Sequence, residues 1–125
     1  MTKTKQKTEE IETIDETSII VKYLYDKGIE AFAEVPKERA SAFVSVERTS
    51  GSIQNQTIQK AMFAINCWGE TRARSANFAK RVIELLQDAD ELNEVFDVKI
   101  TSINNNPDPD SGQARTLVVC EIIFN

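Results

Sequence analysis

Hydrophobic residues recur with two different periods along this chain, and each change of period separates a predicted helix from a predicted strand. Between Thr13 and Gly28 the spacing is helical. Glu16 follows Thr13 by three residues, which is the pattern of a capping box, and Gly28 is a typical helix stop. The hydrophobic face of this first predicted helix consists of Ile14, Ile20, Val21, Leu24 and Tyr25.

A second helical period runs from Arg72 to about Ala89, with Thr71 as its predicted N-cap. One face of this segment is apolar and the opposite face is charged, as in an amphipathic helix that covers a core. The predicted buried stripe is Ala79, Val82, Ile83 and Leu86, and the predicted solvent side is Arg72, Arg74, Lys80, Arg81 and Glu84.

The remaining hydrophobic residues alternate with polar ones, which is typical of strands that lie half-buried in a sheet. Five strands are predicted, over residues 29–35, 42–48, 60–68, 95–103 and 115–124. Polar loops are expected at 36–41, 49–59, 88–94 and 104–112. The third strand has apolar residues on both faces, so we place it in the middle of the sheet.

This order of elements, α-β-β-β-α-β-β, indicates an α+β fold: a single mixed or antiparallel sheet of about five strands with two amphipathic helices on one face. Residues 9–125 form one domain in this interpretation, and residues 1–8, with three lysines, form a flexible basic tail. Two helices can cover only one face of the sheet. The apolar second face of the third strand is therefore covered either by the sheet curling over itself or by a partner subunit.

Composition narrows the chemistry available to these 125 residues. The chain contains no histidine, which excludes Ser-His-Asp and Cys-His catalysis and all metal sites built on histidine. A net charge of -5 disfavours a dedicated DNA-binding protein, because an acidic surface repels the phosphate backbone. We therefore expect neither an enzyme nor a protein that binds nucleic acid in a sequence-specific manner.

Cofactor and metal motifs are also missing from the sequence. Cys67 and Cys120 lie within apolar runs and are interpreted as reduced core residues, although a disulfide between them stays open. The loop that begins at Asp108 resembles the opening of a calcium-binding loop but has Gln113 and Val119 where such a loop needs glycine and glutamate. The glycines form no phosphate-binding pattern. We expect no cofactor, no metal ion, no signal peptide and no membrane anchor, and hence a soluble cytosolic protein.

Two segments resemble a known class of proteins: residues 34–51 (EVPKERASAFVSVERTSG) and residues 106–124 (NPDPDSGQARTLVVCEIIF). Together with KYLYDKGIEAFAEV before the first segment and INCWGETRARSANFA between the two, they are similar to small proteins of the head-tail junction in long-tailed phages and prophages. The resemblance covers about residues 18–124 and is strongest to the lambda-like tail terminator, or tail-completion, family of siphoviruses.

This resemblance implies a non-enzymatic structural protein that assembles in the host cytoplasm and becomes part of the neck of the virion. Such a protein forms a ring, usually of six subunits, that caps the tail tube, ends its polymerisation and joins the tail to the head connector. Charged residues at the borders of loops and strands are then expected to contact neighbouring subunits. The expected contact residues are Arg39, Arg48, Arg72, Arg115, Asp108 and Asp110.

Two alternatives remain open at this point. The chain could be another component of the same junction, such as a head-completion or connector protein or the tube protein, because related folds occur there. It could also belong to a different class, a small cytosolic ligand-binding regulatory domain, for which a large apolar pocket would be the sign.

Overall fold

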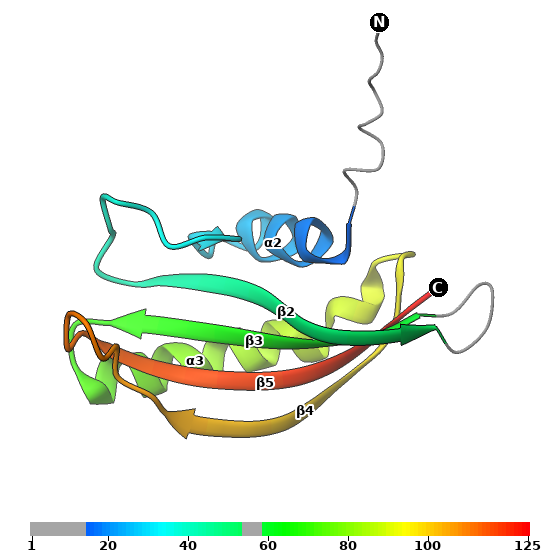
Figure 1. The fold of residues 1–125 in the computed structure, drawn as a ribbon. Coiled ribbons are helices and arrows are strands. Elements are labelled where there is room, and N and C mark those ends of the chain that lie inside the picture. The colour runs from blue at the N-terminus through cyan, green and yellow to red at the C-terminus, as the bar shows by residue number, and fades with distance from the viewer. Residues whose placement is uncertain (1–14, 54–58) are drawn as a thin grey trace, which may run out of the picture.

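The computed structural model describes residues 15–53 and 59–125, so the predicted basic tail and the predicted cap at Thr13 lie outside the described residues. Within these two ranges the chain forms two helices and a five-stranded sheet (Figure 1). The helices are α2 (Glu16–Asp26) and α3 (Arg72–Gln87), and a short 3-10 turn, η1 (Ala89–Glu91), follows α3. The strands are β1 (Ala31–Phe32), β2 (Phe43–Ile53), β3 (Gln59–Gly69), β4 (Val95–Asn105) and β5 (Ala114–Phe124).

The sheet has the order β1-β2-β3-β5-β4, which confirms the predicted central position of β3. Strand β1 pairs with β2 in parallel, and all other pairs are antiparallel, so the sheet is mixed. The α+β class and the order of elements are as predicted from the hydrophobic pattern. Strand β5 lies between β3 and β4 although it comes after both in the sequence.

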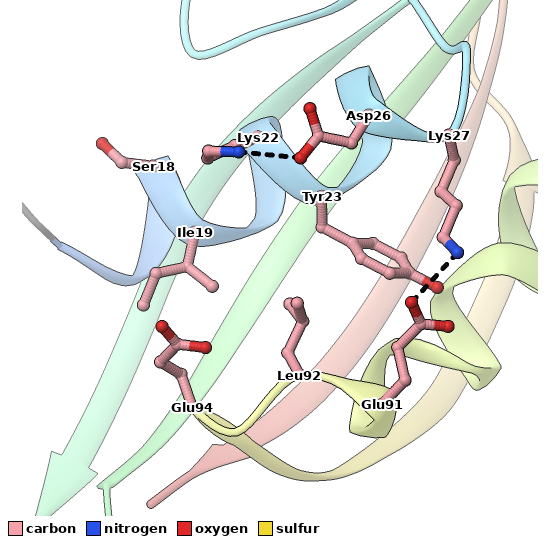
Figure 2. Close-up of a pocket in the computed structure, with 9 residues that line it drawn as sticks. All are labelled: Ser18, Ile19, Lys22, Tyr23, Asp26, Lys27, Glu91, Leu92 and Glu94. Atoms are coloured by element: carbon pink, nitrogen blue, oxygen red, sulfur yellow. Dashed lines mark hydrogen bonds and ion pairs between the residues drawn. The ribbon is translucent and has the colours of Figure 1, made fainter.

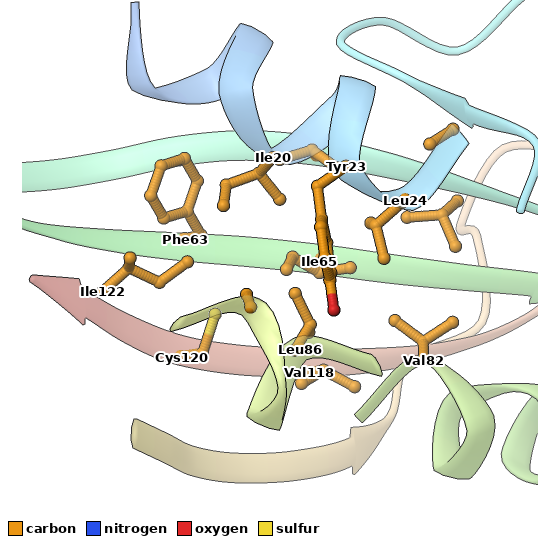
Figure 3. Close-up of a cluster of buried hydrophobic side chains, with 14 of the residues drawn as sticks. Ile20, Tyr23, Leu24, Phe63, Ile65, Val82, Leu86, Val118, Cys120 and Ile122 are labelled. Carbon is orange, nitrogen blue, oxygen red and sulfur yellow. The ribbon is translucent and has the colours of Figure 1, made fainter. Parts of the chain in front are cut away.

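The hydrophobic core lies between the two helices and one face of the sheet, called here the helix-side face (Figure 3). Alternate residues of the strands point to it, such as Phe63 and Ile65 on β3 and Val118 on β5. Helix α3 buries Ala79, Val82 and Leu86, which confirms three residues of its predicted stripe, whereas Ile83 is only partly buried. Burial of a side chain of this size typically stabilises a fold by about 1.5–3 kcal/mol.

Helix α2 begins later than the Thr13 capping box predicted, because Asp15 is its N-cap. The Asp15 carboxylate accepts a hydrogen bond of 2.8 Å from the backbone N–H of Ser18. The predicted face is also partly wrong: Ile20 and Leu24 are buried, but Tyr25 is exposed and Tyr23 is buried in its place. Residues 20, 23 and 24 follow the i, i+3, i+4 spacing, and they define the face that meets the core.

Strand β1 is much shorter than the predicted strand at 29–35, and only Ala31 and Phe32 pair with β2. The backbone N–H of Val44 also donates to the carbonyl of Glu30 at 2.8 Å. After Phe32 the chain leaves the sheet edge, so Ala33 and Val35 are exposed in spite of their alternation with glutamates. Alternation alone therefore overestimated this strand.

Strand β2 is longer than predicted and includes Thr49–Ile53, which the sequence suggested was loop. The pairing with β3 shifts between Arg48 and Ser50, so Thr49 is accommodated as a bulge. Gly51, expected at a turn, pairs with Ala61 within the ladder. A long partner strand thus keeps polar residues in the sheet that would form a loop elsewhere.

The junction between β3 and α3 is closely packed. A Cβ atom placed on Gly69 would lie 2.8 Å from the backbone nitrogen of Ser75 and 2.9 Å from its Cα, so the side-chain-free glycine lets the first turn of α3 approach the strand. The Thr71 side chain accepts from the N–H of Arg74, which confirms the predicted N-cap. Ser75 Oγ lies 2.8 Å from the buried Thr116 hydroxyl of β5. These contacts fix the start of α3 on the sheet.

Candidate functional site

An aromatic and arginine cluster covers one end of the other sheet face, which faces away from the helices and is called here the outer face. Trp68 on β3 stacks on Phe43 of β2, with 5.2 Å between ring centroids and 11° between the planes. Its indole N–H donates to Ser45 Oγ at 3.1 Å. The guanidinium carbons of Arg39 and Arg115 lie 5.1 and 4.9 Å from its ring centroid. Trp68 is consequently only 2% exposed although it points away from the helices.

Arg115 connects this cluster to the turn between β4 and β5. Its Nε donates to the carbonyl of Asn106 at 2.8 Å, and its guanidinium lies 3.9 Å from the Asp108 carboxylate. Arg39 reaches the same turn through a 3.2 Å hydrogen bond to Gln113 Oε1. The two arginines therefore join the 33–42 segment, the central strand and the β4–β5 turn into one unit.

The β4–β5 turn is ordered by its own side chains. The carboxylate of Asp108 accepts from the hydroxyl of Ser111 at 2.6 Å and from its backbone N–H at 3.2 Å. The Ser111 hydroxyl contributes most to holding the pKa of Asp108 below its usual value. Asp110 is exposed at the tip of this turn.

Beyond the Trp68 cluster, the outer face is not covered by described residues. Met62 and Ala64 of β3 and Leu117, Val119 and Ile123 of β5 are only half-buried there. The Lys60–Glu121 ion pair of 3.5 Å lies on the same face. The strands bend (Figure 1), but the part of the chain covering this face extends only over the end near Trp68. Of the two predicted covers, the described part of the chain therefore provides only a partial one.

A groove of about 500 Å³ lies between α2 and the segment that joins η1 to β4 (Figure 2). Ile19, Tyr23 and Leu92 form its apolar surface. Lys27 bridges the groove to Glu91 at 3.0 Å. Four more polar residues complete the lining: Ser18, Lys22, Asp26 and Glu94.

Tyr23 lies at the inner side of this groove. Its hydroxyl donates a 2.6 Å hydrogen bond to the backbone carbonyl of Leu85 on α3. Burial, with a smaller contribution from Glu91 and neighbouring carboxylates, raises the pKa of Tyr23 from 10 to about 12. The neutral hydroxyl is thus favoured, and it ties α2 to α3 beneath the groove.

The predicted contact residues are distributed over three regions. Arg39, Arg115 and Asp108 meet in the Trp68 cluster, as described above. Arg48 lies on the helix-side face of β2, and its Nε is 3.7 Å from the Glu16 carboxylate of α2. Arg72 is exposed in the first turn of α3.

Sequence reasoning did not find the Trp68 cluster as a unit. Trp68 and Arg115 lie directly opposite each other in the β3–β5 register, and they are far apart in the sequence. Their closeness in the fold depends on the pairing of β3 with β5, and no local sequence pattern indicates which strands pair. Tyr23 was also missed, although its spacing from Ile20 was a usable signal.

Both cysteines are buried and free, which confirms their interpretation as reduced core residues. Burial raises the pKa of each thiol from 9 to about 12. Among residues 15–53 and 59–125, no three histidine, cysteine or acidic side chains are grouped closely enough to hold a metal ion. No helix in this part of the chain is sufficiently long and apolar to span a bilayer.

No family model matches this sequence, and no curated protein sequence matches it. The fold is nevertheless similar to that of a chain in a solved structure described as the virion of a native gene transfer agent (GTA) particle. The match covers 90% of this chain and 87% of that chain, with a TM-score of 0.54 and 14% sequence identity. The two chains therefore share an architecture over nearly their whole lengths.

Proposed function

We propose that this protein is a non-enzymatic structural component of a phage-like virion, and that it acts as a tail terminator. The observation that carries the proposal is the fold likeness to a chain of a gene transfer agent virion over 90% of the present chain. The resemblance of residues 34–51 and 106–124 to head-tail junction proteins supports the same class from the sequence. In this role the protein resides in the neck of the particle after assembly in the host cytoplasm.

The proposed assembly is a ring, with six subunits as its expected size, that contacts the tail tube protein on one side and the head connector on the other. Two features support a subunit interface. The outer face presents half-buried apolar side chains such as Leu117 and Val119, and apolar patches of this kind are typical of contact surfaces. The six predicted contact residues stay part of this proposal. Of these, Arg39, Arg72 and Asp110 are exposed and have no ion pair within the described residues.

Deletion of the gene in a particle-producing host, followed by electron microscopy, tests this function. A terminator ends tube polymerisation, so we expect overlong tails in the deletion strain and tails of normal length after complementation with the wild-type gene. Normal tails beside unjoined heads would instead assign the protein to the connector. Particles identical to those of the parent would contradict any role in the junction.

One observation bears on the alternative of a ligand-binding domain, namely the groove beside Tyr23. Its two pairs of opposite charges, Lys22–Asp26 at 2.8 Å and Lys27–Glu91 at 3.0 Å, neutralise each other instead of pointing at a ligand. A small molecule that raises the unfolding temperature in a concentration-dependent way would favour this alternative.

A further inference from the structure

The segment that joins β1 to β2, residues 33–42, covers one end of the outer face but leaves most of its own residues exposed. It is called here the strap, and Figure 1 shows it in cyan as an arc beside the sheet. Nine of its ten residues are exposed, and Pro36 is the exception. In the part of the chain that the structure describes, none of the ten forms a backbone–backbone hydrogen bond. A segment with so few buried contacts and backbone hydrogen bonds has low local stability.

The two ends of the strap are held close to each other. Phe32, just before the strap, and Phe43, just after it, are in edge-to-face contact, with 6.3 Å between their ring centroids. The backbone N–H of Val44 donates to the carbonyl of Glu30 at 2.8 Å. Because its ends are fixed together in this way, the strap can swing about them without disturbing the strands that it joins.

Arg39 holds the middle of the strap to the rest of the domain. Its guanidinium carbon lies 5.1 Å from the Trp68 ring centroid, and its Nη1 donates to Gln113 Oε1 at 3.2 Å. Within the described residues, no other strap residue forms a side-chain hydrogen bond or an ion pair. A single side chain therefore acts as the clasp of the strap.

A hollow of about 380 Å³ lies between the strap and the sheet. Glu34 and Val35 line it from the strap, and Asn66 and Arg115 line it from the sheet. Over this stretch the strap spans the outer face instead of packing against it. The closed position consequently gains little from dispersion contacts, which require atoms in close approach.

Asn66 gives a physical reason for the strap to open. Its Oδ1 is buried and has no hydrogen-bond partner. A buried acceptor without a donor destabilises the state in which it occurs. An open strap admits water, which can donate to this oxygen. Asn66 therefore favours the open position, whereas Arg39 favours the closed one.

We propose that the strap opens as a unit about its two ends when Arg39 leaves Trp68 and Gln113. Opening exposes the Trp68 ring and the Asn66 carboxamide, and it extends the accessible part of the outer face toward Trp68. The inference goes beyond the proposed ring, because opening is a property of a single subunit.

A distance measurement across the clasp tests this proposal in the full-length protein. Spin labels are attached at Glu38→Cys in the strap and at Asp110→Cys in the β4–β5 turn, since both residues are exposed. Cys67 and Cys120 are buried and should stay unlabelled in the folded protein. Pulsed electron paramagnetic resonance then gives the distribution of distances between the labels. Acrylamide quenching of Trp68, the single tryptophan, is measured in parallel without labels.

Four substitutions are compared in this background, and circular dichroism verifies that each variant is folded. Arg39→Ala removes the clasp. Gln113→Ala removes one of its two partners but leaves the arginine able to cover Trp68. Asn66→Leu removes the acceptor that has no donor. Lys37→Ala is the matched control, because Lys37 is an exposed cation of the same strap with no ion pair within the described residues.

We expect a main short distance and a minor longer one in the labelled protein without further substitution. Arg39→Ala should raise the ratio of the longer to the shorter component about fivefold, since a cation–π contact and a hydrogen bond are lost. Gln113→Ala should change the ratio in the same direction by a smaller factor. Asn66→Leu should lower the ratio, and Lys37→Ala should leave it unchanged. Quenching of Trp68 should follow the same order.

One distance distribution shared by all variants would overturn the proposal, because the strap would then be fixed. Increased quenching in Arg39→Ala without a change in distance would also overturn it, since the arginine would then only cover the ring. An equal shift in Lys37→Ala would reject Arg39 as the clasp. If Arg39→Ala does not fold, Gln113→Ala and Asn66→Leu still give the two opposite shifts that the proposal requires. These outcomes are separate from the particles of the deletion strain, which test the proposed function.

Discussion

Replacement of Gly69 by alanine is the sharpest test of the packing between β3 and α3, because two physical effects predict opposite signs. Gly69 does not have a positive φ. At such a position alanine normally stabilises a protein by about 0.4–1 kcal/mol, since it restricts the unfolded chain. In this structure, however, the added methyl group would lie 2.8 Å from the backbone nitrogen of Ser75, which belongs to a helix and cannot rotate away.

The steric effect should prevail. Overpacking of this kind typically destabilises by about 1–3 kcal/mol, so after the entropic gain we expect a net loss of about 1–2 kcal/mol. With a urea m-value of roughly 2 kcal/mol/M, the unfolding midpoint should fall by about 0.5–1 M without a change in m. The same displacement moves the residue next to Trp68, so acrylamide should quench the tryptophan fluorescence more strongly.

Gly28→Ala is the matched control for this experiment. Gly28 has a φ of 91°, and an added Cβ would meet no atom within 4 Å, so any loss there comes from backbone conformation alone. It lies after α2, away from Trp68, and should leave the quenching unchanged. A Gly69→Ala protein with an unchanged or higher urea midpoint would refute the close approach of α3 to the sheet.

Three further predictions concern the core and the Trp68 cluster. Tyr23→Phe should lower the free energy of unfolding by about 1 kcal/mol in urea denaturation, because the buried hydrogen bond from the hydroxyl to the Leu85 carbonyl is lost, while that carbonyl keeps its bond from the Asp88 N–H. Because the folded-state pKa of Tyr23 is raised to about 12, its contribution to the free energy of unfolding is fully present below pH 10 and is lost between about pH 10 and 12. The stability of the wild type should therefore fall more steeply over this range than that of Tyr23→Phe. Parallel curves of stability against pH would contradict this. Cys67 and Cys120 should react with Ellman's reagent only in denaturant, as their burial and raised pKa require, and rapid labelling of the folded protein would argue against the described core. Arg115→Ala should increase acrylamide quenching of Trp68 and reduce stability by about 1–2 kcal/mol, whereas Lys99→Ala should change neither.

The sequence predicted those features that depend on a few neighbouring residues. The N-cap at Thr71 and the buried stripe of α3 are read from local spacing, and the two apolar faces of β3 correctly placed it in the middle of the sheet. Features that depend on strand pairing were not accessible in this way. Gly51 looks like a turn residue until its partner Ala61 holds it in the ladder.

In the candidate site, too, the sequence indicated individual exposed residues but not the contacts that depend on strand pairing. Exposed arginines at loop borders could be selected from the sequence, and Arg72 is indeed exposed. That Arg115 stacks on Trp68 follows only from the β3–β5 register, and that Arg48 lies near Glu16 follows only from the packing of α2 on β2.

The place of β5 in the sheet has a consequence for how the protein is made. A ribosome synthesises β3 and β4 before β5. In the sheet, however, β3 and β4 do not pair with each other, and both pair with β5. Their pairings therefore close late, and a nascent chain exposes two strand edges until residues 114–124 have emerged. An incompletely translated chain lacks the pairing with β5 that holds β4 in the sheet, so the sheet is completed only when the last strand has been synthesised.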